Sequence, residues 1–172
     1  LVTDYGHGML GPRAVELLCG QARFLAVNTQ VNAGNLGFNT VSKYPHADFV
    51  CVSETEMRLD ARSRRRELRD IVLEASENLS CDRIVITKGP EGCLCYSKDE
   101  GFLEVPAVAV DVVDRVGAGD AVFSVAALCA AQRAPNEIIG LIGNVAGAEA
   151  VATVGNRTTI QRVPFFRHIE TL

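Results

Sequence analysis

The sequence lacks tryptophan, is poor in lysine, and contains no long run of apolar residues. A helix that crosses a bilayer needs about 20 consecutive apolar residues, so no transmembrane segment is predicted. Positive charge is also scarce, since 17 Lys and Arg residues stand against 21 Asp and Glu residues, for a net charge of −4. Such a chain has no general attraction for polyanions, and we expect neither nucleic acid nor a membrane as a partner.

The chain also lacks cysteine pairs at metal-binding spacing, and no secretory leader is recognised at its start. Its six cysteines lie mostly in apolar segments, as is typical of reduced, buried thiols in a cytosolic protein. Cys93 and Cys95 would share one face of a strand, but no CxxC pair or Cys/His cluster accompanies them. We therefore expect a cytoplasmic protein with buried thiols, and a metal site at these cysteines is the weaker alternative.

Short apolar runs typical of strands alternate along the chain with longer segments typical of helices. The 172 residues suffice for one domain with a single core. Short, wholly apolar runs predict strands that need a layer of helices on each face. The pattern predicts a three-layer α/β/α domain over residues 1–172, with a mostly parallel central sheet and a short antiparallel section. Strands are expected at 1–3, 24–27, 48–52, 83–87, 93–96 and 102–105, and helices at 12–20, 54–59, 67–78, 117–131 and 136–154.

The strongest chemical signal is a Gly-Ala-Gly-Asp sequence, Gly117 to Asp120, between a Val-rich strand and an apolar helix. Small residues let backbone N–H groups approach an anion, and a helix start adds the positive end of its dipole. Asp120 could then accept the proton of an attacking hydroxyl while these groups hold a phosphoryl group. Alternatively, the small residues only permit close packing and Asp120 caps the helix. A Walker A sequence is absent, which excludes a P-loop NTPase.

Four segments resemble motifs of the PfkB/ribokinase family of carbohydrate kinases, and they occur in the family's order. Asp114 to Phe123 resembles the signature D-T-x-G-A-G-D-x-F, and Asp4 to Gly8 is similar to D-Y-x-K-G. Ile86 to Gly92 is similar to V-T-x-G-x-x-G, and Asn144 to Ala150 is similar to the late helix that borders the adenine. The Asp4 segment most resembles kinases that act on heptose phosphates.

The resemblance implies an ATP- and Mg²⁺-dependent kinase that phosphorylates a hydroxyl of a sugar or sugar phosphate. Gly117, Ala118 and Gly119 would form the anion hole, and Asp120 would be the general base. The nucleotide would contact four further residues, with Thr87 and Gly89 near its ribose and phosphates and with Val112 and Asn144 at the adenine. The structural alternatives are a strand-end turn for Thr87 and Gly89 and a locally bonded helix residue for Asn144.

Several positions depart from the family pattern. The D-P-N-x-R segment reads Asn28 to Asn32, and the N-x-x-E segment reads Ser53 to Glu56, which keeps only Glu56 for an indirect contact with Mg²⁺. Arg115 replaces the usual Thr, and His7 replaces the usual Lys. These changes affect the expected metal arrangement and specificity but leave the anion hole and the base intact. The alternative function is a non-catalytic nucleotide- or sugar-binding regulator on the same fold.

Two further expectations concern an amide-rich loop and the extent of the chain. Asn28, Asn32, Asn35 and Asn39 lie in one loop near the expected triphosphate, where they contact the substrate or hold the turns of the loop. Family members are longer, and the part that normally holds the sugar lid is not in this sequence. We therefore expect a C-terminal piece of a kinase that is inactive alone, and the resemblance leaves room for a homodimer.

Overall fold

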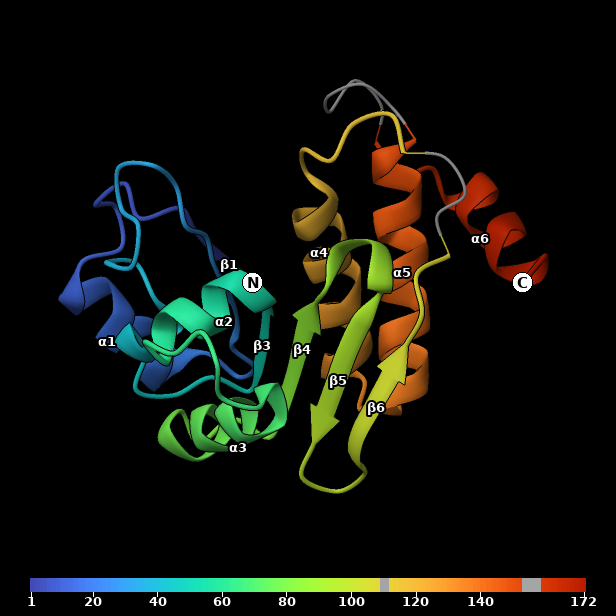
Figure 1. The fold of residues 1–172 in the computed structure, drawn as a ribbon. Coiled ribbons are helices and arrows are strands. Elements are labelled where there is room, and N and C mark those ends of the chain that lie inside the picture. Colours follow the sequence, from blue (N-terminus) through green and yellow to red (C-terminus); the bar gives the residue numbers. More distant parts are fainter. Residues whose placement is uncertain (109–111, 153–158) are drawn as a thin grey trace.

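A six-stranded sheet forms the centre of the part that the computed structural model describes, which is residues 1–108, 112–152 and 159–172 (Figure 1). The strands follow in sequence order across the sheet: β1 (Val2–Asp4), β2 (Ala26–Thr29), β3 (Phe49–Ser53), β4 (Arg83–Thr87), β5 (Cys93–Ser97) and β6 (Gly101–Val105). Strands β1 to β4 pair in parallel, whereas β5 and β6 form an antiparallel hairpin beside β4. The predicted mostly parallel sheet with a short antiparallel section is confirmed.

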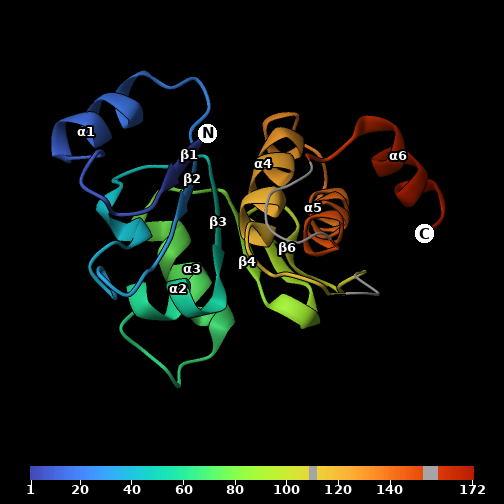
Figure 2. The same cartoon turned by 90° about the horizontal axis from the view of Figure 1, so that it is seen from above.

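Helices cover both faces of this sheet. They are α1 (Pro12–Gln21), α2 (Glu54–Asp60), α3 (Leu68–Asn78), α4 (Ala118–Ala131), α5 (Asn136–Val151) and α6 (Arg162–Glu170), with short 3-10 turns at η1 (Val41–Lys43) and η2 (Gly89–Glu91). Helices α1, α2 and α3 lie on one side of the strands, and α4 and α5 lie on the other (Figure 2). No helix in the described part of the chain is long and apolar enough to cross a membrane.

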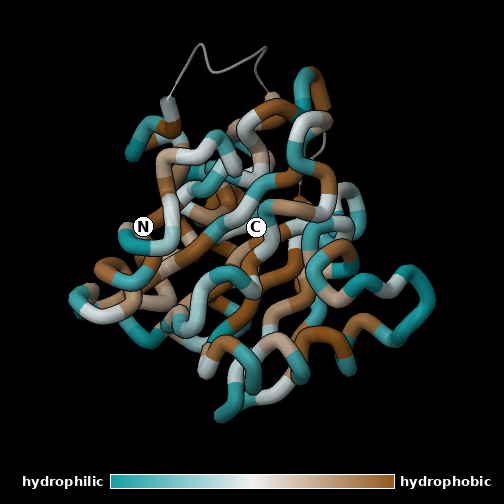
Figure 3. The backbone as a smooth tube through the Cα atoms, turned by 90° about the vertical axis from the view of Figure 1, so that its left-hand side faces the viewer, coloured by the Kyte–Doolittle hydropathy of each residue, from teal (hydrophilic) through white to brown (hydrophobic). Residues whose placement is uncertain are grey.

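Alternation of side chains along the strands divides the core into two clusters. In β3, Phe49 and Cys51 face the cluster that includes α4 and α5, while Val50 and Val52 face the cluster under α1 and α3. Both faces are therefore apolar, which explains why the strands read as continuous apolar runs. The tube in Figure 3 is brown where strands cross the centre and mostly teal in the outer loops. All six cysteines are free thiols, and four of them are buried.

Three details differ from the sequence prediction. The segment from 112 to 116 forms no strand, because the amides of Val113 and Asp114 bond instead to the carbonyl of Val151 at the end of α5, at 2.8 and 3.1 Å. The rest of the expected Val-rich strand, and the last residues of the helix expected to reach 154, lie outside the described residues. Helix α6 was not predicted, since it buries no residue fully. The apolar pattern of residues 12–20 also predicts that Ala14, Val15, Leu17 and Leu18 form the apolar side of α1, but Leu17 is half exposed.

Gly140 of α5 allows the helix to pack closely against the hairpin. A Cβ atom on Gly140 would lie 2.6 Å from Val105 Cγ2 and 2.9 Å from Cys95 Sγ. We predict that Gly140→Ala lowers the free energy of unfolding by about 1–3 kcal/mol, because the core would be overpacked. Urea unfolding measures this, with Gly20→Ala in α1 as control, since a Cβ there meets no atom within 4 Å. Equal stability changes in the two variants would contradict the prediction.

Candidate functional site

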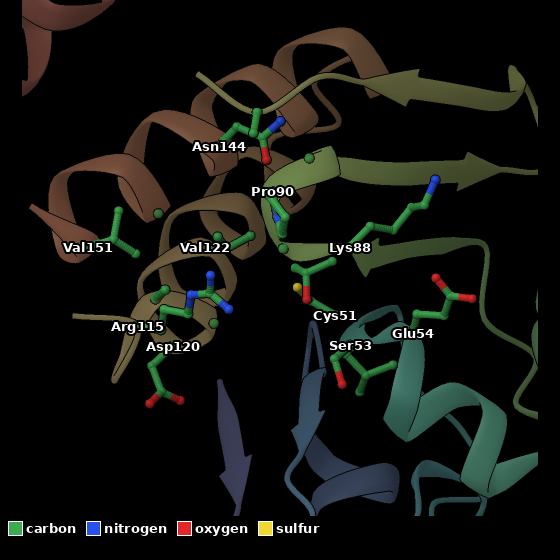
Figure 4. A pocket seen from close by; sticks show the side chains of 18 of the residues that line it. Cys51, Ser53, Glu54, Lys88, Pro90, Arg115, Asp120, Val122, Asn144 and Val151 are labelled. Atoms are coloured by element: carbon green, nitrogen blue, oxygen red, sulfur yellow. The ribbon is translucent and has the colours of Figure 1, made fainter. Parts of the chain in front are cut away.

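A cavity of about 720 Å³ opens where the carboxyl ends of β2, β3 and β4 meet the amino end of α4 (Figure 4). The carboxyl edge of a parallel sheet is the usual place for a ligand in α/β folds. Every residue that the sequence predicted for the site lines this cavity: Glu56, Thr87, Gly89, Val112, Gly117, Ala118, Gly119, Asp120 and Asn144. Segments that are far apart in the sequence are thus brought together in one pocket.

The amino end of α4 has no side-chain cap. Gly117 is the N-cap residue, and its φ of 83° lies in the left-handed region that favours glycine. The first N–H groups of a helix have no partner within the helix. At α4 the Ala118 amide makes only a long bond to the carbonyl of Arg115, at 3.4 Å, and the amides of Gly117 and Gly119 make none within the described part of the chain. These groups can therefore turn to an anion beside the positive end of the helix dipole. A Cβ atom on Gly119 would meet nothing within 4 Å, so protein packing does not require glycine there. These features favour anion binding over the packing alternative.

Asp120 lies in the first turn of α4, and its carboxylate is held by two donors from other elements. Gln30 Nε2 donates to Asp120 Oδ1 at 2.6 Å, and the hydroxyl of Tyr5 donates to Oδ2 at 3.4 Å. Partial burial and the charge of Asp120 raise the pKa of Tyr5, so the phenol stays a donor at neutral pH. Because Gly117 is the cap and these contacts leave the helix, Asp120 is not the helix cap that the alternative required.

The two donors belong to a frame built around the buried carboxylate of Asp4. Asp4 pairs with Lys43, accepts a hydrogen bond from the Tyr44 hydroxyl at 2.8 Å, and accepts another from the Gly6 amide at 3.0 Å. Burial alone would raise the pKa of Asp4, but these hydrogen bonds and the charge of Lys43 outweigh burial and lower it. Gly6 has a φ of 69°, and a Cβ there would lie 2.2 Å from Asn35 Nδ2. The turn that carries Tyr5 is therefore tightly fixed.

The asparagines of the 28–39 loop mainly hold backbone rather than reach into the cavity. Asn39 Nδ2 donates to the carbonyl of Asp4 at 2.7 Å, and Asn35 and Asn32 donate to that of Tyr5 at 2.9 and 3.0 Å. This favours the turn-holding alternative for these three residues. Asn28 differs, since it lines the cavity and its buried Oδ1 has no hydrogen-bond partner among the described residues.

Glu56 already has three donors. Its Oε2 accepts from the Ser53 amide at 2.8 Å and from the Ser53 hydroxyl at 2.7 Å, and its Oε1 accepts from the Val31 amide at 3.1 Å. Together with the bond from the Glu56 amide to Ser53 Oγ at 3.2 Å, this is a capping box at the start of α2. The described residues contain no cluster of three His, Cys, Asp or Glu side chains that could hold a metal ion.

The predicted nucleotide residues form one wall of the cavity. Thr87 ends β4, and Gly89, with a φ of 60°, begins the following turn η2. Asn144 Nδ2 donates to the carbonyls of Val105 and Pro106 at 3.1 and 2.9 Å and so fixes the chain that leaves β6. Asn144 is therefore not the locally bonded helix residue of the alternative, because its partners are 38 and 39 residues away. Val112 lies at the rim and is 54% exposed.

Among the described residues, three cations line the cavity, and they differ in their partners. Arg58 Nε lies 2.7 Å from Glu54 Oε1, and Lys88 Nζ lies 3.1 Å from Glu91 Oε2. Arg115 makes no ion pair within the described part of the chain, and Figure 4 shows it next to Asp120 at the start of α4. Of these three cations, Arg115 is thus the one whose charge is not already paired and can face an anionic ligand.

The sequence prediction gave no role to Gln30 or Tyr5, the two partners of Asp120. Gln30 stands at the third position of the segment that matches D-P-N-x-R, and Tyr5 follows Asp4 in the D-Y-x-K-G segment. The signal that could have found them is topological. Both residues follow parallel strands, β1 and β2, and therefore lie at the same sheet edge as Asp120.

The architecture is that of a three-layer α/β fold with a cavity at the carboxyl edge of the sheet. Residues 14–162 match the family model described as pfkB family carbohydrate kinase. This match covers more than half of the chain, and the chain therefore belongs to the pfkB family of carbohydrate kinases. The recognition made from the motifs is confirmed.

Relatives and solved structures agree with this assignment. The chain is 29% identical over 161 residues to bifunctional protein HldE of Geotalea uraniireducens (strain Rf4), and 30% identical over 158 residues to that of Koribacter versatilis (strain Ellin345). These matches cover 92% and 90% of the chain but 32% of each relative, so the chain spans about a third of their length. Phosphofructokinase-2 from Escherichia coli in complex with potassium is 20% identical, with a TM-score of 0.75, over 92% of the chain and 52% of that structure. A putative ribokinase II from E. coli, in its apo form, is 19% identical, with a TM-score of 0.76, over 93% and 53%, and the predicted ribokinase-like fold is confirmed.

The pairing of Lys43 with buried Asp4 yields a stability prediction. We expect Lys43→Met to lower the free energy of unfolding by about 1–3 kcal/mol at neutral pH, because a buried carboxylate loses a charged donor. The folded-state pKa of Asp4 lies below its unfolded value, so its stabilising contribution is present above that value, about 3.9. It is lost as the pH falls through the lower folded-state pKa, and the difference between variant and wild type should shrink there.

Urea unfolding at several pH values from about 3 to 7 measures this difference. The matched control is Lys98→Met, which breaks the exposed Lys98–Asp82 pair and should change stability little. A Lys43→Met effect as small as that of the control would show that the pair does not anchor the frame.

Proposed function

We propose that this chain is the nucleotide-binding and catalytic part of an ATP-dependent kinase that phosphorylates a hydroxyl of a sugar or sugar phosphate. The observation that carries the proposal is the position of the Asp120 carboxylate beside the uncapped amino end of α4, in the cavity at the sheet edge. Membership of the pfkB family supports sugar phosphorylation in general. The residue roles that follow are our own assignment.

In the proposed reaction, the backbone N–H groups of Gly117, Ala118 and Gly119 bind the oxygens of the γ-phosphoryl group. Asp120 accepts the proton as the O–H bond of the acceptor breaks. The acceptor oxygen forms a bond to the γ-phosphorus, the bond from this phosphorus to the β–γ bridging oxygen breaks, and ADP leaves. The protein forms no covalent bond in this reaction. Most of the rate enhancement would therefore come from positioning of the reactants and from preorganised dipoles.

The nucleotide would occupy the rest of the cavity. Thr87 and Gly89 would lie near its ribose and phosphates, and Val112 and Asn144 would border the adenine. A volume of about 720 Å³ falls in the range of small-molecule sites, about 300–1,000 Å³. Arg115 would add a positive charge near the phosphates, and its lack of an ion pair among the described residues supports this role.

Magnesium would arrive with the nucleotide rather than occupy a protein cage. Mg²⁺ keeps several waters and is usually bound by one or two carboxylates together with substrate phosphates. Glu56 fits an indirect contact through water, because its oxygens already accept three hydrogen bonds. When bound, the ion would neutralise charge on the phosphates.

The acceptor class is the least determined part of the proposal. The similarity to proteins named bifunctional protein HldE, together with the Asp4-Tyr5-Gly6 segment, makes heptose phosphates the first acceptors to test.

Six free thiols fit the cytoplasmic location that we propose.

A non-catalytic regulator on the same fold is the second candidate. The observation that favours it is the amide character of positions 28 and 32, where the family pattern carries charged residues. The retained carboxylate of Asp120 beside the anion-binding turn opposes it. Turnover of ATP with any member of a panel of hexoses, heptoses and their phosphates, using the natural full-length protein, would exclude the regulator.

We predict that Asp120→Asn in the natural full-length protein lowers kcat by about 10²–10⁴ and leaves ATP affinity largely unchanged, because only the general base is removed. Steady-state kinetics with the acceptor found in that panel, together with calorimetry for ATP, measures both quantities. Asp70→Asn is the control, since Asp70 is an exposed carboxylate in the first turn of α3. Near-normal kcat in Asp120→Asn would disprove the assignment of the base.

We also predict that the 172-residue chain binds ATP weakly and in a Mg²⁺-sensitive manner. Arg115→Ala should weaken ATP binding by about 2- to 5-fold, as expected for an exposed charge contact, and leave adenosine binding unchanged. Titration calorimetry with ATP, ADP and adenosine measures this, and Arg13→Ala on the exposed side of α1 is the control. Absence of heat with millimolar ATP or ADP, for a folded sample, would contradict the nucleotide site.

A further inference from the structure

We propose that Gln30 is a positioning residue for the general base, and that it leaves Asp120 Oδ2 as the oxygen that takes the acceptor's proton. This inference rests on the proposed role of Asp120. The two oxygens of the Asp120 carboxylate differ in the length of the hydrogen bond that each accepts. Oδ1 accepts from Gln30 Nε2 at 2.6 Å, which is a short hydrogen bond, whereas Oδ2 has the Tyr5 hydroxyl at 3.4 Å, near the limit of such bonds.

The two donors also differ in how firmly they are held. The backbone amide of Gln30 donates to the carbonyl of Asp4 at 2.9 Å, and its carbonyl accepts from Asn39 Nδ2 at 3.2 Å. Gln30 is half buried, whereas Tyr5 is 42% exposed at the rim of the site. A substrate hydroxyl can therefore displace the weak Tyr5 contact at Oδ2 more easily than the amide at Oδ1.

An amide suits this role because of its chemistry. A glutamine side chain offers an N–H donor that neither carries charge nor takes up a proton near neutral pH. It can therefore orient a carboxylate without neutralising it as an ion pair with Lys or Arg would. The described residues show no ion pair to Asp120; the titratable side chain that contacts it is Tyr5, and Figure 4 shows Arg115 beside it.

The bond also links two separate parts of the site. Gln30 follows β2, Asp120 lies in the first turn of α4, and the two residues are 90 positions apart in the sequence. In the proposed reaction the acceptor's O–H bond breaks, its proton passes to Oδ2, and the acceptor oxygen bonds to the γ-phosphorus as ADP departs. Through Gln30, the frame around buried Asp4 would set the direction in which Oδ2 points.

A first test separates positioning from binding. Gln30→Leu keeps a similar size but removes the donor, and we expect kcat to fall about 10- to 100-fold while KM for ATP stays unchanged. The assay uses the natural full-length protein, ATP, Mg²⁺ and the acceptor found in the sugar panel. Unchanged kcat, or a loss confined to KM for ATP, would overturn the inference.

A second test needs no acceptor and detects the contact directly. Gln30→Glu would place a second carboxylate within hydrogen-bond distance of Asp120, and two such groups cannot both ionise freely. We expect the titration midpoint of the Asp120 carboxyl, followed by ¹³C NMR and assigned with Asp120→Asn, to rise by about one pH unit or more.

Gln132→Glu is the control, because Gln132 follows the opposite end of the same helix, about 18 Å along its axis. A midpoint as little changed in Gln30→Glu as in Gln132→Glu would overturn the inference, even if Gln30→Leu fails to fold. If Asp120→Asn keeps near-normal kcat, the assignment of Asp120 as the base fails, whatever the Gln30 variants do. If the natural full-length protein turns over no sugar of the panel, the proposed function fails. If Asp120→Asn is inactive but both Gln30 variants behave like wild type, only the positioning role fails.

Discussion

Parallel pairing of β1 to β4 forces their carboxyl ends to one edge of the sheet, and the pocket depends on this constraint. Tyr5, Gln30, Ser53 and Thr87 each stand at or just after a strand end, so the sheet alone brings them to the same edge. Helix α4 packs on the sheet with its amino end toward that edge, and the N–H groups of its first turn then complete the pocket. The cavity is thus a consequence of the topology, and the identity of the strand-end residues decides its chemistry.

Asp4 contributes both to the stability of the fold and to the position of the proposed general base. A carboxylate as buried as this one is costly unless it is paired and hydrogen-bonded, and Lys43, Tyr44 and the amide of Gly6 satisfy it. The same residue accepts a bond from the Gln30 amide through its backbone carbonyl, and so joins the core to the loop that reaches Asp120. Asn32, Asn35 and Asn39 of that loop bond to this frame, whereas Asn28 lines the cavity. A change that loosens the frame should therefore alter the direction of the Asp120 carboxylate before it alters the fold.

Much of this architecture could be predicted because the signals are local. Apolar runs with turn residues between them gave the six strands within a few residues, and the glycines of 117–119 marked the helix start. Helix α6 could not be predicted, because its few contacts, such as His168 Nδ1 with Glu149 Oε1 at 2.7 Å, depend on tertiary placement. The prediction of a Val-rich strand is wrong at residues 112–113. β-branched residues indicate a strand only where a neighbouring strand pairs with them. The Gln30–Asp120 bond joins residues 90 apart, and no local pattern encodes it.

The amide-for-charge exchanges near β2 bear on how the site would balance its charges. Where the family pattern has Asp and Arg, this chain has Asn28 and Asn32, so one negative and one positive charge are absent from the same loop. Their loss together leaves the net charge of the loop unchanged, while Arg115 adds a positive charge on the opposite wall beside α4. A bound nucleotide would then face the positive charge of Arg115 on the α4 side of the cavity. On the β2 side it would find side chains that form hydrogen bonds but carry no charge. In that arrangement, direction rather than charge is what the β2 loop contributes, which is the role proposed for Gln30.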